Sequence, residues 1–81
     1  MRDFHNIPIV LKKHASQAIT LRFKMDAEDV VHYIKTARVI KDIDKDGNIG
    51  ILQSDIGDRK IQFICTIREG VLYIITVEEC K

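Results

Sequence analysis

The sequence has few of the features that place a small protein in a special class. Its 81 residues include no tryptophan, one proline and four glycines, and contain no internal repeat, low-complexity stretch or linker. No apolar run reaches the length of about 18 residues that a transmembrane helix needs, and no signal-peptide pattern is visible. We therefore expect a single domain over residues 1–81, located in the cytoplasm, with no membrane partner.

Cysteine is also scarce. Cys65 and Cys80 form no metal-binding pattern, and the histidines have no partners at ligand spacing. The sequence therefore predicts no metal site and no cofactor, and it predicts free thiols in a reducing compartment. Because Cys65 falls on the face of a predicted strand that should be buried, it is a poor candidate for a nucleophile.

Charge of one sign is not in excess over the whole chain. The formal net charge of +1 gives no global attraction to nucleic acid. The distribution is uneven, however, because residues 11–41 hold seven lysines and arginines against three acidic residues. The usual explanation of such a run is a solvated helix face.

Two helices and a sheet are predicted. The hydrophobic fraction of 46% is supplied mostly by isoleucine and valine, which favours strands. A first helix is predicted over Lys12–Phe23, although its apolar stripe is thin. A second helix is predicted from Asp26, a good N-cap, to Thr36, with acidic residues in its first turn.

The strands follow from a change of period. Ile7–Leu11 predicts a short edge strand, because Pro8 cannot donate a hydrogen bond to a neighbour. After Thr36 the hydrophobic period becomes two, and the connections are short and turn-like. The four strands predicted there are Ala37–Ile43, Asn48–Ile56, Lys60–Arg68 and Val71–Glu78. We expect an α+β fold, with two helices packed on a four- to five-stranded, mainly antiparallel meander sheet.

A two-residue turn at Glu69-Gly70 predicts the register of the last two strands. It places Thr66 opposite Tyr73 and Ile64 opposite Ile75. The more apolar face should lie under the helices. The other face should carry Gln62, Thr66, Arg68 and Tyr73 at one end and Ile51, Ile64, Ile75 and Val77 at the other. An exposed apolar patch of this kind commonly marks a partner or homodimer surface.

The stretch from Asp42 to Gln53 has two interpretations. As a calcium loop it offers carboxylates at Asp42, Asp44 and Asp46. However, Gln53 stands where an EF-hand needs a bidentate glutamate, and no exit helix can begin after it. An Asp-Gly hairpin between two apolar runs is the preferred interpretation, with weak calcium binding as a minor alternative.

The order of strand, helix, helix and meander resembles the RelE/ParE-like toxin superfamily, in particular a small family of unknown function grouped with those toxins. The matching features include a strand at Ile9–Leu11, His14-Ala15 at a helix start, Arg22, and an acidic turn before Val30-Val31. The closing strands end in Thr76-Val77, as in that family. The resemblance covers nearly the whole chain. It implies a RelE-like fold and an mRNA endonuclease or translation inhibitor that acts on RNA or the ribosome and is neutralised by an antitoxin protein.

A ribonuclease of this kind activates a ribose 2′-hydroxyl, stabilises a pentacoordinate phosphate and protonates the leaving oxygen. His14 could titrate near neutral pH, Arg22 and Arg68 could hold phosphate, and Tyr73 could stack on a base. These four residues are the catalytic candidates that the resemblance implies. The RNA-binding candidates are Lys12, Lys13 and Arg38.

Each candidate also has an ordinary structural explanation. His14 could pack or cap a helix, Arg68 could be solvated beside a turn, and Tyr73 could pack across the strands against Thr66. The alternative function is therefore a non-catalytic interaction module. It would use the apolar half of the open sheet face for a partner or a homodimer.

Overall fold

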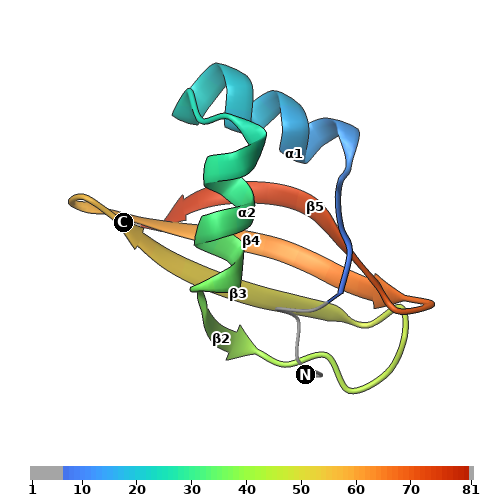
Figure 1. Cartoon of the computed structure of the whole chain (residues 1–81). Coiled ribbons are helices and arrows are strands. Elements are labelled where there is room, and N and C mark those ends of the chain that lie inside the picture. Colours follow the sequence, from blue (N-terminus) through green and yellow to red (C-terminus); the bar gives the residue numbers. More distant parts are fainter. Residues whose placement is uncertain (1–6, 81) are drawn as a thin grey trace.

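A five-stranded mixed sheet with helical segments packed on one face forms the computed structural model of the chain, which describes residues 7–80 (Figure 1). The elements in order are β1 (Ile9–Leu11), α1 (Lys13–Ala18), η1 (Ile19–Phe23), α2 (Ala27–Lys35), β2 (Arg38–Lys41), β3 (Ile49–Ile56), β4 (Arg59–Arg68) and β5 (Val71–Cys80). The strand order across the sheet is β1-β5-β4-β3-β2. The β1 strand is parallel to β5, and all other neighbours are antiparallel.

Both predicted helices are present. The first consists of α1 followed directly by the π-helix η1, which ends at Lys24 in a left-handed conformation with φ 52°. Ala15, Ile19 and Phe23 are buried at a spacing of four residues, which the wider π-helical turn keeps toward the sheet. The second helix, α2, is capped as predicted, because the Asp26 side chain accepts a hydrogen bond of 2.9 Å from the Asp29 N–H.

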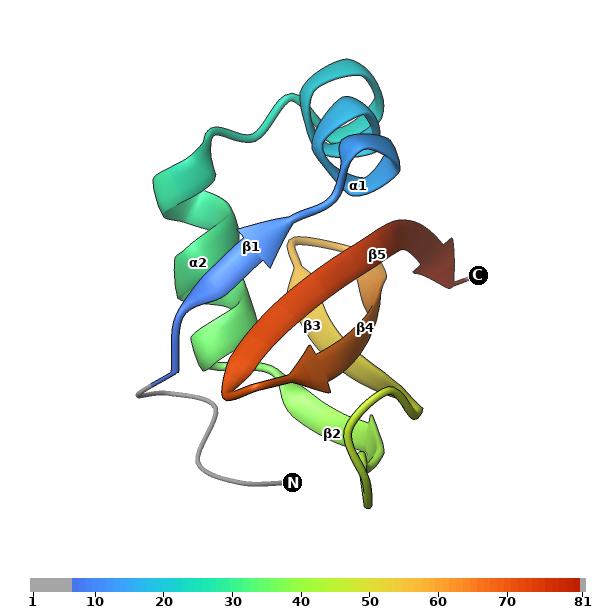
Figure 2. The same ribbon diagram turned by 90° about the vertical axis from the view of Figure 1, so that its right-hand side faces the viewer.

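The core lies between the helical segments and one face of the sheet, and Figure 2 shows α1 and α2 together on that side. The α1 helix packs against β5, and α2 packs against β3. Ser54 is buried beneath α2, where its hydroxyl donates a 2.6 Å hydrogen bond to the Tyr33 carbonyl. The fully buried side chains include Leu52, Phe63, Leu72, Ile74 and Val77.

The predicted register of β4 and β5 is correct near the turn and wrong beyond it. Thr66 does pair with Tyr73, but Ile64 pairs with Thr76 and not with Ile75. A β-bulge shifts the register there and reverses which residues of β5 face the helices. Val77, predicted on the open face, is therefore buried in the core with 0% exposure. The bulge places an apolar valine in the core where the unshifted register would place a threonine or a glutamate.

The hairpin interpretation of the Asp42–Gln53 stretch is confirmed, because β2 and β3 are antiparallel neighbours. The β2 strand is shorter than predicted, and the connection to β3 spans residues 42–48. Ile43 anchors this connection in the core, where its side chain packs over Gly50. Both thiols are free, with Cys65 buried and Cys80 exposed. Within residues 7–80, no helix is long and apolar enough to cross a bilayer.

Candidate functional site

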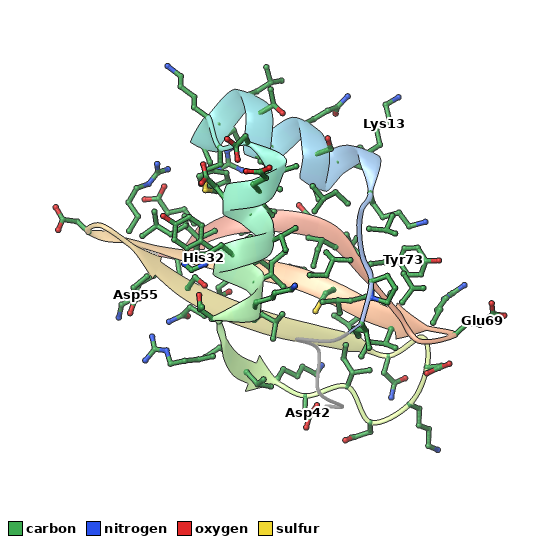
Figure 3. All side chains as sticks on the ribbon, in the orientation of Figure 1. Lys13, His32, Asp42, Asp55, Glu69 and Tyr73 are labelled. Carbon is green, nitrogen blue, oxygen red and sulfur yellow. The ribbon has the colours of Figure 1, made fainter. Side chains whose placement is uncertain are left out.

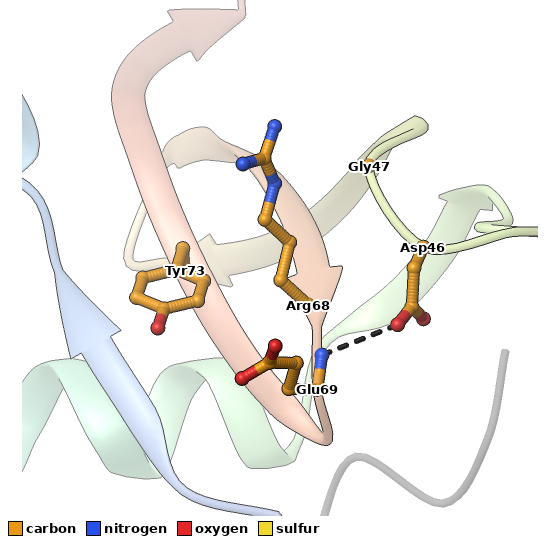
Figure 4. A pocket seen from close by; sticks show the side chains of 5 residues that line it. All are labelled: Asp46, Gly47, Arg68, Glu69 and Tyr73. Carbon is orange, nitrogen blue, oxygen red and sulfur yellow. Dashed lines mark hydrogen bonds between the residues drawn. The ribbon is translucent and has the colours of Figure 1, made fainter.

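A hollow lies on the open face of the sheet, at the end that carries the turn between β4 and β5 (Figure 4). Its volume is about 430 Å³, and its lining residues are Asp46, Gly47, Arg68, Glu69 and Tyr73. A second hollow of about 360 Å³ lies beside it and shares Arg68 and Tyr73. Its other lining residues are Lys12, Thr66 and Ile75. We call these two adjoining depressions the corner hollow.

The parallel pairing of β1 with β5 brings Lys12 to Tyr73. Val10 pairs with Tyr73 in the ladder, and the Lys12 N–H donates a 2.9 Å hydrogen bond to the Ile74 carbonyl. This anchored backbone places the Lys12 Nζ atom 4.8 Å from the centroid of the Tyr73 ring. An ammonium group at this distance is attracted by the negative face of the ring.

Two opposite charges in the corner hollow are unengaged. Among residues 7–80, neither the Arg68 guanidinium nor the Glu69 carboxylate forms a hydrogen bond or an ion pair. In Figure 4 the Arg68 side chain extends away from the turn, whereas the Glu69 carboxylate lies toward Tyr73. A ligand in the hollow would meet a cation and a carboxylate on different sides.

Hydrogen bonds fasten the connection at residues 42–48 to the β4–β5 hairpin and so form one wall of the hollow. The Asp46 carboxylate accepts from the Glu69 N–H at 3.2 Å, and the Gly47 N–H donates to the Ile67 carbonyl at 2.9 Å. The Thr66 hydroxyl donates to the Asn48 carbonyl at 2.8 Å. This last bond explains why Thr66, predicted to be open to solvent or a ligand, is only 8% exposed.

Two of the three carboxylates considered as calcium ligands accept hydrogen bonds from the backbone. Asp46 is engaged by the Glu69 N–H, and the Asp42 carboxylate accepts a 2.7 Å hydrogen bond from the Ile43 N–H. In the part of the chain that the structure describes, no three histidine, cysteine or acidic side chains are grouped to hold a metal ion. Asp42 and Asp46 therefore each hold a backbone N–H of the fold.

The predicted site residues fall in several places. The corner hollow brings together Lys12, Arg68 and Tyr73. Lys13 and His14 are exposed on the first turn of α1 and do not line it, and Lys13 points away from the sheet in Figure 3.

The other two predicted arginines lie farther along the chain, in other elements. Arg22 lies on η1, with its guanidinium carbon 5.3 Å from the centroid of the Phe23 ring. Arg38 lies on the edge strand β2 and forms a 3.4 Å ion pair with Asp55. Neither arginine lines the corner hollow.

Three residues that line the hollow were not among the predicted site residues: Asp46, Gly47 and Glu69. Glu69 follows Arg68 directly and lies in a two-residue turn, so the sequence alone was sufficient to place it beside Arg68. Asp46 reaches the site through a long-range contact that has no short-range signal. The sequence predicted Asp46 only as a residue of the hairpin turn or as a calcium ligand.

The chemistry available in the corner hollow is that of binding a polar, anionic and planar group. Arg68 and Lys12 can hold phosphate, Tyr73 can stack on a planar ring, and Glu69 can accept hydrogen bonds. Cys65 takes no part, because it is buried on the opposite face, and burial raises the pKa of its thiol to about 11.

Comparison of the chain with known proteins finds no relative: no protein-family model, no curated protein and no solved structure matches it.

Proposed function

We propose that this chain is a RelE-like toxin-family protein that contacts single-stranded RNA through the corner hollow. The observation that carries the proposal is the placement of Lys12, 4.8 Å above the Tyr73 ring, beside an unengaged Arg68. An aromatic ring with cations around it is the usual combination for single-stranded nucleic acid, because bases stack on the ring while the cations hold phosphate.

The charge distribution agrees with a local contact. The net charge of +1 offers no long-range attraction, so few phosphates would be neutralised when RNA binds. We therefore expect modest affinity with a shallow salt dependence. A short stretch of RNA, rather than a long duplex, fits a hollow of this size.

Cleavage is the second part of the proposal. His14, the base for a ribose 2′-hydroxyl in this proposal, lies outside the hollow at the start of α1, two positions after Lys12, so the RNA would have to extend beyond the hollow to reach it. Arg68 would stabilise the charge that develops on the phosphate. An antitoxin protein that covers the corner hollow would keep such an activity in check. Arg22 and Arg38 have no part in this arrangement, because Arg22 lies on η1 against the Phe23 ring and Arg38 is paired with Asp55 on the far edge strand β2.

The binding part is tested with fluorescence anisotropy on a labelled single-stranded RNA. We expect Arg68→Ala and Tyr73→Ala each to weaken binding on the order of tenfold. Arg38→Ala is the matched control, because it removes an exposed arginine outside the hollow and should change affinity by less than about twofold. Equal loss in all three variants would overturn the assignment of the site.

The cleavage part is tested by induced expression in a bacterial host, with growth followed and the 5′ ends of cellular mRNA mapped. Growth arrest with new mRNA ends that disappear in His14→Ala and Arg68→Ala would support a toxin. Normal growth with unchanged mRNA would remove the endonuclease and leave the binding proposal to the anisotropy measurement.

A specific observation favours a second candidate function, that of a non-catalytic interaction module. The open face carries exposed apolar side chains: Val10 on the edge strand β1 is 41% exposed, and Ile49 at the start of β3 is 42% exposed. Ile51 and Ile64 pair beside them and are half-buried. Sedimentation velocity over a range of concentrations tests this candidate. Self-association that Ile49→Lys abolishes and Arg68→Ala preserves would favour it.

A further inference from the structure

Glu69 occupies a backbone conformation that its side chain does not favour. It is the first residue of the two-residue turn between β4 and β5, with φ 51°, and Gly70 follows with φ 76°. Hairpin turns with two positive φ angles prefer asparagine or glycine at the first position, because other side chains crowd the backbone there. A glutamate at this position therefore works against the stability of the turn.

With the residues that the structure describes, the Glu69 carboxylate forms no contact that would compensate for this unfavourable backbone conformation. The backbone N–H of Glu69 is held by Asp46, but in the described chain the carboxylate itself has no hydrogen bond and no ion pair. It lies instead on the rim of the corner hollow, on the side toward Tyr73 (Figure 4). An unfavourable backbone conformation combined with an unused charged group beside a cavity points to a role in binding.

The charges of the hollow define how a nucleotide would lie in it. Glu69 repels phosphate, whereas Arg68 and Lys12 attract it. A base stacked on Tyr73 would therefore keep its phosphate toward the two cations and direct its hydrogen-bonding edge toward Glu69. What the carboxylate can accept then decides which base is bound.

A carboxylate only accepts hydrogen bonds, and its two oxygens can accept two parallel ones. Among the four RNA bases, only guanine presents two adjacent donors, its N1–H and its 2-amino group, on the Watson–Crick edge. Adenine and cytosine place a ring acceptor beside the amino group, and uracil places carbonyl oxygens on both sides of its single donor. We propose that Glu69 makes the corner hollow selective for guanine in single-stranded RNA, an inference that rests on the proposed contact with RNA.

The test uses single-stranded RNA pentamers of uridine with guanosine, inosine or adenosine at the centre, with affinities measured by anisotropy at one fixed salt concentration. We expect guanosine to bind about tenfold tighter than adenosine. Inosine lacks the 2-amino group and should fall between them. In Glu69→Gln the advantage of guanosine should fall to about twofold or less, because the amide has one acceptor oxygen.

A second variant separates recognition from folding. Glu69→Asn suits the positive φ angle, so its melting temperature should equal or exceed that of the wild type, while the guanosine preference should be lost. Arg68→Ala should weaken all three pentamers alike and keep their order. A guanosine preference that survives in both Glu69 variants, or no preference in the wild type, would overturn this inference and leave the RNA contact standing. If no pentamer binds the wild type, the proposed function fails and this inference fails with it.

Discussion

The Asp46 carboxylate accepts a hydrogen bond from the backbone N–H of Glu69 at 3.2 Å, and this bond joins two connections that are distant in the sequence. One is the connection between β2 and β3, and the other is the turn between β4 and β5. The position of Arg68 and Glu69 therefore depends on a residue outside their own hairpin. The neighbouring bond from the Gly47 N–H to the Ile67 carbonyl, at 2.9 Å, holds the same two segments together.

Replacing Asp46 with alanine should remove this bond. We expect Asp46→Ala to lower the free energy of unfolding by about 0.5–1.5 kcal/mol, which is typical for one hydrogen bond. Urea denaturation measures the change. Asp44→Ala is the matched control, because Asp44 lies in the same connection and is exposed, and its loss should cost less than about 0.5 kcal/mol. Equal losses in the two variants would show that the Asp46 bond does not stabilise the fold.

Gly50 should tolerate no side chain. A Cβ atom at this position would overlap the Ile43 side chain and would lie 3.1 Å from the Lys41 carbonyl oxygen. We expect Gly50→Ala to lower the free energy of unfolding by about 1–3 kcal/mol, as overpacking does in other cores. A double-mutant cycle checks the cause. Gly50→Ala should cost clearly less in an Ile43→Ala background, and an unchanged cost would contradict the overlap.

The bulge in β5 predicts an unequal response of neighbouring residues. Val77 is fully buried, so Val77→Ala should lower the free energy of unfolding by about 1–3 kcal/mol through lost burial and a cavity. Thr76 is one position earlier and half-buried on the open face, so Thr76→Ala should lower the free energy of unfolding by less than about 1 kcal/mol. Chemical denaturation of the two variants tests the register directly. A larger loss of stability in Thr76→Ala than in Val77→Ala would contradict the bulge and favour the unshifted pairing.

Cys65 and Cys80 should react very differently with an alkylating reagent. Burial raises the pKa of the Cys65 thiol to about 11, whereas Cys80 is exposed. At about pH 8 we expect iodoacetamide to modify Cys80 and leave Cys65 unmodified in the native protein, as read by mass spectrometry of peptides. Rapid modification of both would contradict the burial of Cys65.

The same thiol makes stability depend on alkaline pH. An unfolded cysteine has a pKa of about 8.5, so above that pH the unfolded chain releases a proton that the folded chain retains. The contribution of Cys65 to stability is therefore fully present below about pH 8.5 and is lost as the pH rises toward about 11. Denaturation at several alkaline pH values should show a smaller loss in Cys65→Ala than in the wild type.

Local patterns in the sequence were sufficient for most of the fold. The cap at Asp26 and the turns at Gly57-Asp58 and Glu69-Gly70 depend on neighbours within a few positions, and the structure has them where they were predicted. The connection between β2 and β3 is longer than predicted. The bulge at Ile75 was not predictable from an alternating pattern, because it is a departure from that pattern. The π-helical form of the second half of the first helix, at Ile19–Phe23, was likewise not predicted.

The candidate site was predictable only in part. Arg68 and Tyr73 were placed on one face because a short turn joins their strands. Lys12 was predicted to bind RNA for its charge, but its position over Tyr73 depends on a parallel pairing between distant strands. Arg22 and Arg38 shared that charge and lie elsewhere, since charge alone carries no information about long-range pairing.

The parallel pairing of β1 with β5 has a consequence for how the molecule is made. Lys12 is synthesised before Tyr73, and both helices and three strands lie between them in the sequence. The loop-closure entropy of a contact between such distant segments must be overcome before the contact stabilises the fold, which slows its formation. A nascent chain that has not yet reached β5 lacks Tyr73 and therefore has no corner hollow. Whatever this surface does, it begins only after β5 has been synthesised and has paired with β1.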